Sequence, residues 1–323
     1  MSGETSDRLY RTGLGLLAGA VPLVLGAIAV FILVDAVPAI RYQGVSLWTG
    51  IQWNIGNEYG TSLSTHGGVS ALAGATFGIL PYILGTLLTS VVALVIAVPL
   101  GVGAALFLSE WAPARVRPLL SSLVELLAGV PSVVYGLWGL AVVVPAIGGS
   151  VAPWLAARLS FVPFLSGATG TGLGLLAAGV VLAIMVLPLI AATSRDAMQA
   201  TPRELREGAV ALGLTPWETV VGVVLKTARP AMFGAAILAL GRALGETMAV
   251  LMVAGGSINL LPSNIYGPVN TLAAVIASQL DSAFTDPTHM TLHALSAIAL
   301  TLFVIALAVN GLARLIVREG ARA

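Results

Sequence analysis

The stretch GLGLLAGAVPLVLGAIAVFILV, residues 13–34, decides the class of fold, because its 22 residues carry no charge. A helix rises about 1.5 Å per residue, so roughly 20 apolar residues cross a bilayer core. Five further stretches qualify, and we predict six spanning helices over residues 13–35, 79–108, 119–147, 173–194, 230–254 and 288–313. The first stretch exceeds the apolar core of about 7–15 residues found in cleaved secretion signals, so we expect a retained helix.

The composition supports an all-α, polytopic membrane protein with one transmembrane domain over residues 1–323. Hydrophobic residues make up 58% of the chain and charged residues only 9%, and the mean hydropathy is +0.99. Soluble domains carry about 25% charged residues. The absence of cysteine excludes disulfides and thiol nucleophiles. The net charge of +1 does not favour nucleic acid, and the single lysine, Lys226, lies outside any phosphate-binding Walker A motif.

The basic residues predict the orientation. With a cytoplasmic amino terminus, 12 of the 15 basic residues fall on the cytoplasmic side. Arg41 and Arg158 fall outside, and Arg242 falls within the membrane. This asymmetry is what the positive-inside rule describes. We therefore expect both termini to be cytoplasmic.

Two outer segments are long, at residues 36–78 and 255–287. The first carries Trp48, Trp53 and Tyr59 among glycines and serines. This composition is compatible with a docking element at the membrane interface or with a solvated loop that has an aromatic anchor.

Smaller features occur on the same side. Residues 154–165 are apolar but contain Arg158, so we expect an interfacial or re-entrant segment. Asp286 and Pro287 resemble a helix cap followed by proline at the first helical position. We predict no metal site, because too few histidines cluster: His66, His289 and His293.

The cytoplasmic loop at residues 195–229 contains two helix start signals. Thr201 is followed by Pro202 and Glu204, and the same spacing recurs at Thr215, Pro216 and Glu218. Each triplet predicts a capping box with proline at the first helical position. The loop therefore contains a separate short helix before the fifth span.

That short helix is predicted to be amphipathic. Leu205, Ala209 and Leu212 recur at helical spacing, and Gly213 follows as a terminator. An apolar stripe with charged flanks suits docking into a groove of a soluble partner. The alternative is a helix that rests on the lipid headgroups.

The stretch GRALGETMAV, residues 241–250, places two charges inside an apolar run. Arg242 and Glu246 are four residues apart, so one continuous helix would present them on the same face. Gly241 and Gly245 would allow another helix to approach closely. Charges in a membrane face protein or a water-filled cavity, and the arginine fork binds oxyanions. We predict that the pair lines a substrate pathway; the alternative is a structural ion pair.

Glu125 precedes a glycine and a proline, Gly129 and Pro131, near the cytoplasmic start of the third predicted span. Proline removes a helical hydrogen bond and kinks the chain. Glu125 and Pro131 are therefore candidates for an inner gate, and snorkelling of Glu125 toward the headgroups is the alternative.

EGAVALG, residues 207–213, resembles the E-A-A-x-x-x-G loop of the permease subunits of ABC importers. The resemblance implies a coupling helix seated in an ATPase subunit, with Leu205, Glu207, Ala209, Leu212 and Gly213 as its coupling residues. Gly208 departs from the usual alanine, and Lys226 replaces the first proline of the downstream segment, where Pro230 is present.

Two further stretches, ELLAGVPSVVYGLWGL (125–140) and GRALGETMAV, resemble the C-type permease subunit of phosphate-specific ABC importers. The resemblance covers nearly the whole chain. It implies a non-catalytic subunit in the inner membrane of a prokaryote, which forms half of a phosphate pathway and works by alternating access. The implied partners are a sister permease subunit, two ATPase subunits that hold ATP and Mg, an extracytoplasmic phosphate-binding protein and lipid.

Three alternatives differ from this function. A permease for sulfate or molybdate would need the same arginine chemistry. A secondary transporter should have inverted repeats with broken helices, which the sequence does not reveal, and does not explain the coupling loop. An intramembrane enzyme should have a serine–histidine or paired-aspartate arrangement, and none falls within the predicted spans.

Overall fold

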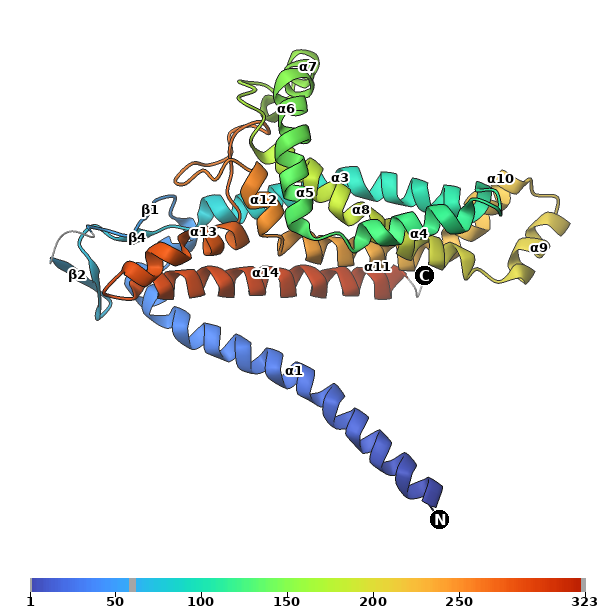
Figure 1. Cartoon of the computed structure of the whole chain (residues 1–323), viewed down its shortest axis with the longest axis horizontal. Coiled ribbons are helices and arrows are strands. Elements are labelled where there is room, and N and C mark those ends of the chain that lie inside the picture. Colours follow the sequence, from blue (N-terminus) through green and yellow to red (C-terminus); the bar gives the residue numbers. More distant parts are fainter. Residues whose placement is uncertain (1, 58–61, 321–323) are drawn as a thin grey trace.

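The computed structural model describes residues 2–57 and 62–320. Within these ranges six helical segments are long and apolar enough to cross a membrane, as predicted: Tyr10–Gln43, Leu80–Trp111, Ser132–Arg158, Leu175–Gln199, Pro216–Leu244 and Met290–Leu315. Four long helices form an elongated bundle in Figure 1: α3 (Leu80–Leu106), α8 (Leu175–Gln199), α11 (Leu225–Leu244) and α14 (Met290–Gly320). Short helices α9 (Arg203–Ala211) and α10 (Pro216–Thr219) lie at one end of the bundle, and the β-strands lie at the other.

Helix α8 is the centre of the bundle. Of its most apolar stretch 72% is buried, whereas no other span exceeds 28%. Glycines allow α3 to pack closely against it: a side chain at Gly179 would clash with Val92, and one at Gly101 would lie 2.9 Å from Cγ2 of Ile190. Close approach of backbones through small residues is a common way to pack helices in membranes.

The third span differs from the prediction of 119–147. Helix α4 (Arg117–Ala128) ends at Gly129, and α5 (Ser132–Trp138) starts after Pro131. Pro131 is extended, with ψ of 139°, so the helix is broken there rather than only kinked. Two π-helical turns (Gly139–Val143 and Ile147–Val151) then join α5 to α6 (Val144–Ala146) and α7 (Ala152–Arg158).

The apolar segment at 154–165 is not one continuous element. Its first five residues, Trp154–Arg158, end the third span as the last part of α7. The remainder is a bend that contains a short 3-10 turn, Pro163–Leu165.

The fifth span also differs from the prediction of 230–254. It starts earlier, at Pro216, and continues from α10 through the π-helical turn Val220–Val224 into α11. It ends at Leu244, and a separate helix α12 (Met248–Val253) follows after a three-residue break.

Helix α1 (Ser2–Gln43) is longer than predicted, so the first eight residues of the predicted outer segment 36–78 are helical. The rest of this segment follows α1. It contains α2 (Ser46–Thr49) and two antiparallel strand pairs, so the all-α prediction missed a small β region: β1 (Trp53–Asn54) with β4 (Thr76–Phe77), and β2 (Leu63–His66) with β3 (Val69–Leu72). Gly67 and Gly68 form the turn between β2 and β3 with φ of 58° and 76°. Two successive positive φ values are typical of a tight hairpin turn.

Aromatic side chains attach this outer segment to the bundle. Trp53 is 4% exposed, and its ring centroid lies 5.3 Å from that of Phe77 and 6.2 Å from that of Tyr82. The indole of Trp48 donates a hydrogen bond of 3.1 Å to Oγ1 of Thr301 in α14. The predicted aromatic anchors therefore pack into the protein itself. Tyr59 lies outside the described residues.

The second outer segment contains α13 (Leu272–Thr285) and leads into α14, which begins at Met290. Asp286 does not cap a helix that starts at Pro287. Instead its carboxylate accepts hydrogen bonds from the backbone amides of Thr288 (2.8 Å) and Thr291 (2.9 Å). Burial favours a raised pKa of Asp286, but the hydrogen bonds from Thr288 and Thr291 outweigh it and hold the pKa below its usual value.

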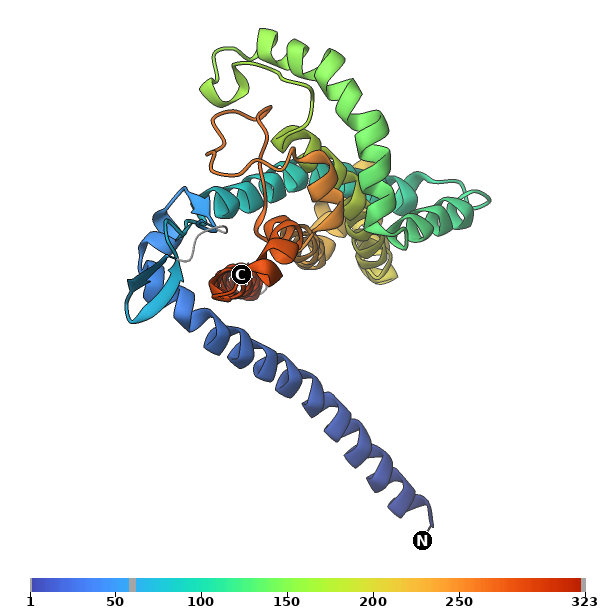
Figure 2. The ribbon, with the colours of Figure 1, turned by 60° about the vertical axis from the view of Figure 1, so that its left-hand side comes forward.

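Helix α1 leaves the bundle along most of its length, as Figures 1 and 2 both show. Its outer half contacts α14, where the Asp35 carboxylate pairs with Nδ1 of His293 at 3.1 Å and accepts a hydrogen bond from Ser296. Its inner half exposes large apolar side chains such as Leu16 and Leu17. The described ends of α1 and α14 lie toward the end of the bundle that carries α9 (Figure 1).

Candidate functional site

Arg242 and Glu246 do not share a helix face, which corrects the geometry predicted for them. Arg242 lies in the last turn of α11, whereas Glu246 lies in the break that follows. The Glu246 carboxylate accepts a hydrogen bond of 3.2 Å from the amide of Ala249, so it caps α12. The Arg242 side chain is exposed. Among the described residues these two side chains form no ion pair with each other, so the self-neutralised pair is wrong in its geometry.

The two predicted close-packing glycines also differ from each other. A side chain at Gly241 would lie 3.7 Å from the amide group of Asn310 in α14, whereas Gly245 faces no other helix. Only Gly241 therefore contributes to helix packing.

The two helix breaks lie next to each other. Helix α12 packs against α5, where a side chain at Gly136 would lie 2.9 Å from Cα of Ala249, and Figure 1 shows the two helices together. The Tyr135 hydroxyl in α5 donates to the carbonyl of Leu127 in α4 at 2.8 Å, which bridges the first break. Arg242 lies within electrostatic range of the same hydroxyl. Arg242 thus stands where two interrupted helices meet, an arrangement found at substrate sites of membrane transporters.

Glu125 pairs with an arginine of α8. Its Oε1 lies 3.0 Å from Nη2 of Arg195, whose guanidinium also contacts Asp196 at 2.7 Å. The Arg195 side chain is 9% exposed and that of Glu125 is 59% exposed. This ion pair joins α4 to α8. The gating role of Glu125 and Pro131 stays a prediction.

The predicted short cytoplasmic helix is present as α9, but one of its two start signals does not form. Thr201 makes no capping hydrogen bond, and Pro202 itself is the N-cap. The second capping box forms as predicted, with Thr215 and Glu218 bonded to each other's backbone amides. Because α8 extends to Gln199 and α10 begins at Pro216, the segment between the spans is shorter than the predicted 195–229.

The end of α9 confirms Gly213 as the terminator. Gly213 has φ of +85°, and its amide and that of Leu214 bond to the carbonyls of Val210 (2.9 Å) and Ala209 (3.1 Å). This is the Schellman pattern, which needs the left-handed residue that glycine provides.

The predicted apolar stripe of α9 is not buried as a whole. Ala209 is 6% exposed and faces the bundle, whereas Leu212 is 84% exposed. Leu205, Glu207 and Gly208 are also exposed. An exposed leucine and glutamate on a short helix leave a surface that another protein can cover.

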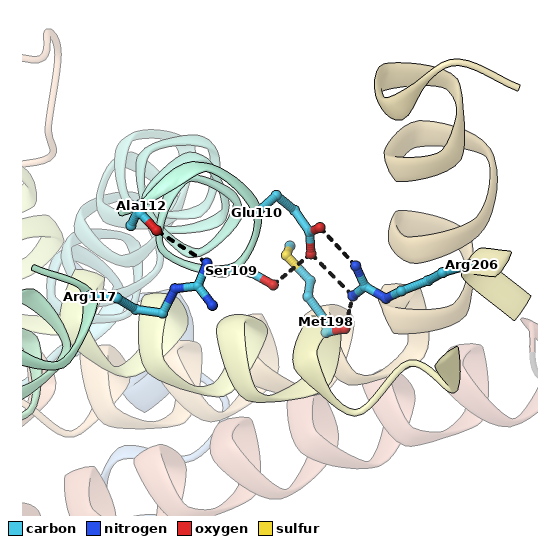
Figure 3. Close-up of polar contacts among 6 residues, drawn as sticks. All are labelled: Ser109, Glu110, Ala112, Arg117, Met198 and Arg206. Atoms are coloured by element: carbon cyan, nitrogen blue, oxygen red, sulfur yellow. Dashed lines mark hydrogen bonds and ion pairs between the residues drawn. The ribbon is translucent and has the colours of Figure 1, made fainter. Parts of the chain in front are cut away.

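A charged cluster that the sequence analysis missed attaches α9 to the bundle (Figure 3). Arg206 forms a two-pronged ion pair with Glu110, with Nη1–Oε2 and Nη2–Oε1 distances of 2.8 and 3.1 Å. Glu110 belongs to the π-helical turn Phe107–Trp111 that ends the second span. Ser109 donates to the Glu110 carboxylate at 2.7 Å, and Arg206 also donates to the carbonyl of Met198 in α8 at 2.8 Å.

A mostly apolar cleft of about 650 Å³ lies beside this cluster. Its walls include Trp111, Val210, Ala211 and Pro216. Trp111 stacks on Trp217 with centroids 5.8 Å apart and rings inclined by 21°. The cleft and the tryptophans are at the same end as α9 and α10 and extend the uncovered surface.

In the part of the chain that the structure describes, no group of three or more His, Asp or Glu side chains is placed to hold a metal ion. His293 pairs with Asp35 and not with His289.

A family model described as a binding-protein-dependent transport system inner membrane component matches residues 97–319. The chain belongs to this family. PstC 1, a phosphate transport system permease protein of Mycobacterium tuberculosis, is 47% identical over 292 residues, which cover 90% of this chain and 86% of that protein. PstC of Xylella fastidiosa is 39% identical over 311 residues, covering 93% and 88%. The chain is therefore a PstC-type permease by sequence.

Among solved structures, an inward-facing form of the MetNI methionine ABC transporter has a TM-score of 0.50, at 21% identity, over 75% of this chain and 94% of that one. This likeness concerns the fold. With six candidate spans and the family match, the chain is a multi-pass membrane protein.

Proposed function

We propose that this chain is the membrane-spanning subunit of an ATP-driven phosphate importer. It forms half of the translocation pathway, and a sister permease subunit forms the other half. The single observation that supports phosphate as the substrate is the identity of 47% to a phosphate transport permease over 90% of the chain. Its own role is non-catalytic: it holds no ATP or Mg, which belong to ATPase partners, and it works by alternating access.

The surfaces of the chain fit such an assembly. The inner half of α1 exposes apolar side chains that a sister subunit or lipid would cover. The exposed residues Leu205, Glu207 and Leu212 of α9 provide a docking surface for an ATPase subunit. An extracytoplasmic phosphate-binding protein would deliver phosphate at the end with the β-strands. Both termini would then be cytoplasmic, in the inner membrane of a prokaryote.

Arg242 is the residue we assign to the pathway. It is exposed at the meeting point of two helix breaks, and in the described structure no carboxylate pairs with it. A guanidinium in this position offers paired N–H groups to a tetrahedral oxyanion. Glu246 contributes a negative charge near the same break, which would limit how tightly phosphate is held. We assign Glu246 this second role beside its capping of α12.

The test is uptake into liposomes that contain the chain with the sister subunit, the ATPase and the binding protein encoded beside it. We expect phosphate uptake that needs ATP, with sulfate and molybdate transported poorly. Uptake that proceeds without ATPase subunits would instead favour a secondary transporter. ATP-dependent uptake that prefers sulfate or molybdate would support the ABC mechanism but show that phosphate is not the substrate.

A further inference from the structure

Arg206 is the polar connection between α9 and the bundle. Among residues 2–57 and 62–320 it is the one α9 side chain with a hydrogen bond or ion pair to another helix. Its guanidinium contacts two spans at once: the carboxylate of Glu110 at the end of the second span and the carbonyl of Met198 near the end of the fourth. Apart from the buried Ala209, the helix faces outward.

The geometry of this connection is suited to transmit force. The ion pair is two-pronged, which fixes direction as well as distance. The Glu110 side chain is 11% exposed and that of Arg206 is 28% exposed, so water screens the pair less than it screens a surface pair. Ser109 holds one carboxylate oxygen, and Arg117 adds a second positive charge within electrostatic range of Glu110.

The position of Glu110 is informative too. It lies in a π-helical turn, and such turns are frequent at functional sites. Helix α3, which leads into this turn, packs against the central helix α8 along its length, and the glycine contacts at Gly101 and Gly179 lock the two together. A displacement of Arg206 would therefore reach α3 and α8 as one unit.

We infer that the Arg206–Glu110 ion pair is the strut that carries motion of α9 into the second and fourth spans. Arg206 and Glu110 are positioning residues for energy coupling, and neither contacts phosphate or ATP. The inference rests on the proposed function, in which an ATPase subunit moves α9. Without the strut, the ATPase would still bind α9 and hydrolyse ATP, but the spans would no longer follow.

The experiment uses the full complex in liposomes and measures phosphate uptake, ATP hydrolysis and the amount of assembled complex. The variants are Arg206→Gln, Glu110→Gln and the double variant, with Arg203→Gln, an exposed arginine of the same helix, as the matched control. Loss of a coupling free energy of typical size lowers uptake at least about fivefold. We expect hydrolysis and assembly to be retained, so that more ATP is consumed per phosphate. The double variant should be no worse than either single one.

A rescue experiment distinguishes an ion pair that transmits motion from one that only stabilises the fold. The chain has no cysteine, so Glu110→Cys with Arg206→Cys gives a clean pair. A flexible two-headed thiol reagent that joins positions 110 and 206 should restore uptake per ATP, whereas a one-headed reagent should not. Absence of rescue after complete cross-linking would overturn the inference. So would normal uptake by Arg206→Gln.

Failure of the proposed function would be recognised separately. In that case the unmodified complex would show no ATP-dependent phosphate uptake, or replacement of Leu205 and Glu207 would leave binding of the ATPase unchanged. If the unmodified complex transports phosphate and the strut variants lose uptake only in proportion to assembled complex, the strut alone is wrong.

Discussion

The end of the molecule with the β-strands and the end with α9 are built in opposite ways. At the strand end, Trp53, Phe77 and Tyr82 form a buried aromatic cluster, and backbone hydrogen bonds pair the strands. At the α9 end, α9 has one buried apolar residue and a charged connection through Arg206. The strand end is therefore held by its own apolar contacts, whereas α9 leaves most of its surface exposed. We expect a partner to cover that surface, as the proposed function requires.

The largest effect should follow from opening the outer cluster. Trp53→Ala removes a buried indole, and such truncations lower the free energy of unfolding by about 3–5 kcal/mol. Thermal unfolding in detergent should therefore begin at a markedly lower temperature. Trp154→Ala is the matched control because Trp154, near the start of α7, is exposed, and it should have little effect. If the two changes lowered the unfolding temperature equally, burial of Trp53 would not be what stabilises this end of the molecule.

A smaller effect, of a different kind, is expected at the α9 end. Leu212→Ala truncates an exposed side chain, so thermal unfolding of the isolated chain should be unchanged. Affinity for the ATPase subunit should fall about tenfold, a typical loss for one central contact residue. Co-purification and titration with the ATPase measure it. A variant that unfolds earlier but binds normally would show that Leu212 serves the fold.

The smallest effect concerns Asp286, whose carboxylate accepts hydrogen bonds from the backbone amides of Thr288 and Thr291. Its pKa is lowered in the folded chain, so its stabilising contribution is present at neutral pH and is lost as the pH falls below its ordinary value of 3.8. Asp286→Asn should lower the free energy of unfolding by about 1 kcal/mol at neutral pH. The difference from the unmodified chain should shrink in strong acid. A difference independent of pH would mean that the charge of Asp286 does not contribute.

The spans could be predicted because hydropathy reports the bilayer directly, and all six are present. The break after Leu244 could not, because Gly245, Glu246 and Thr247 include no proline and apolar residues continue on both sides. Pro131 did signal the other break, but a proline can either kink or end a helix, and only neighbouring contacts decide which. Broken helices therefore do occur here, although none was predicted from the sequence. A lack of broken helices can no longer be used to argue against a secondary transporter. Membership of the permease family distinguishes the two functions instead.

The candidate site shows the same limit. Gly213 and the capping box at Thr215 are local signals, and both were predicted correctly. The ion pair of Arg206 and Glu110 joins residues 96 positions apart, and no local pattern indicates it. The hairpin of β2 and β3, by contrast, does have a local signal, because two adjacent glycines, Gly67 and Gly68, are typical of a tight turn.

The most direct test of the account is the accessibility of position 242 in the assembled importer. Because the chain has no cysteine, Arg242→Cys introduces a single thiol that a charged, water-soluble reagent can report on. If Arg242 lines the pathway, this thiol reacts from the aqueous phase, and its rate of reaction differs between ATP-bound and ATP-free complexes. A thiol at position 242 that stays unreactive in both states, in a complex that still binds its ATPase, would contradict the pathway proposed here.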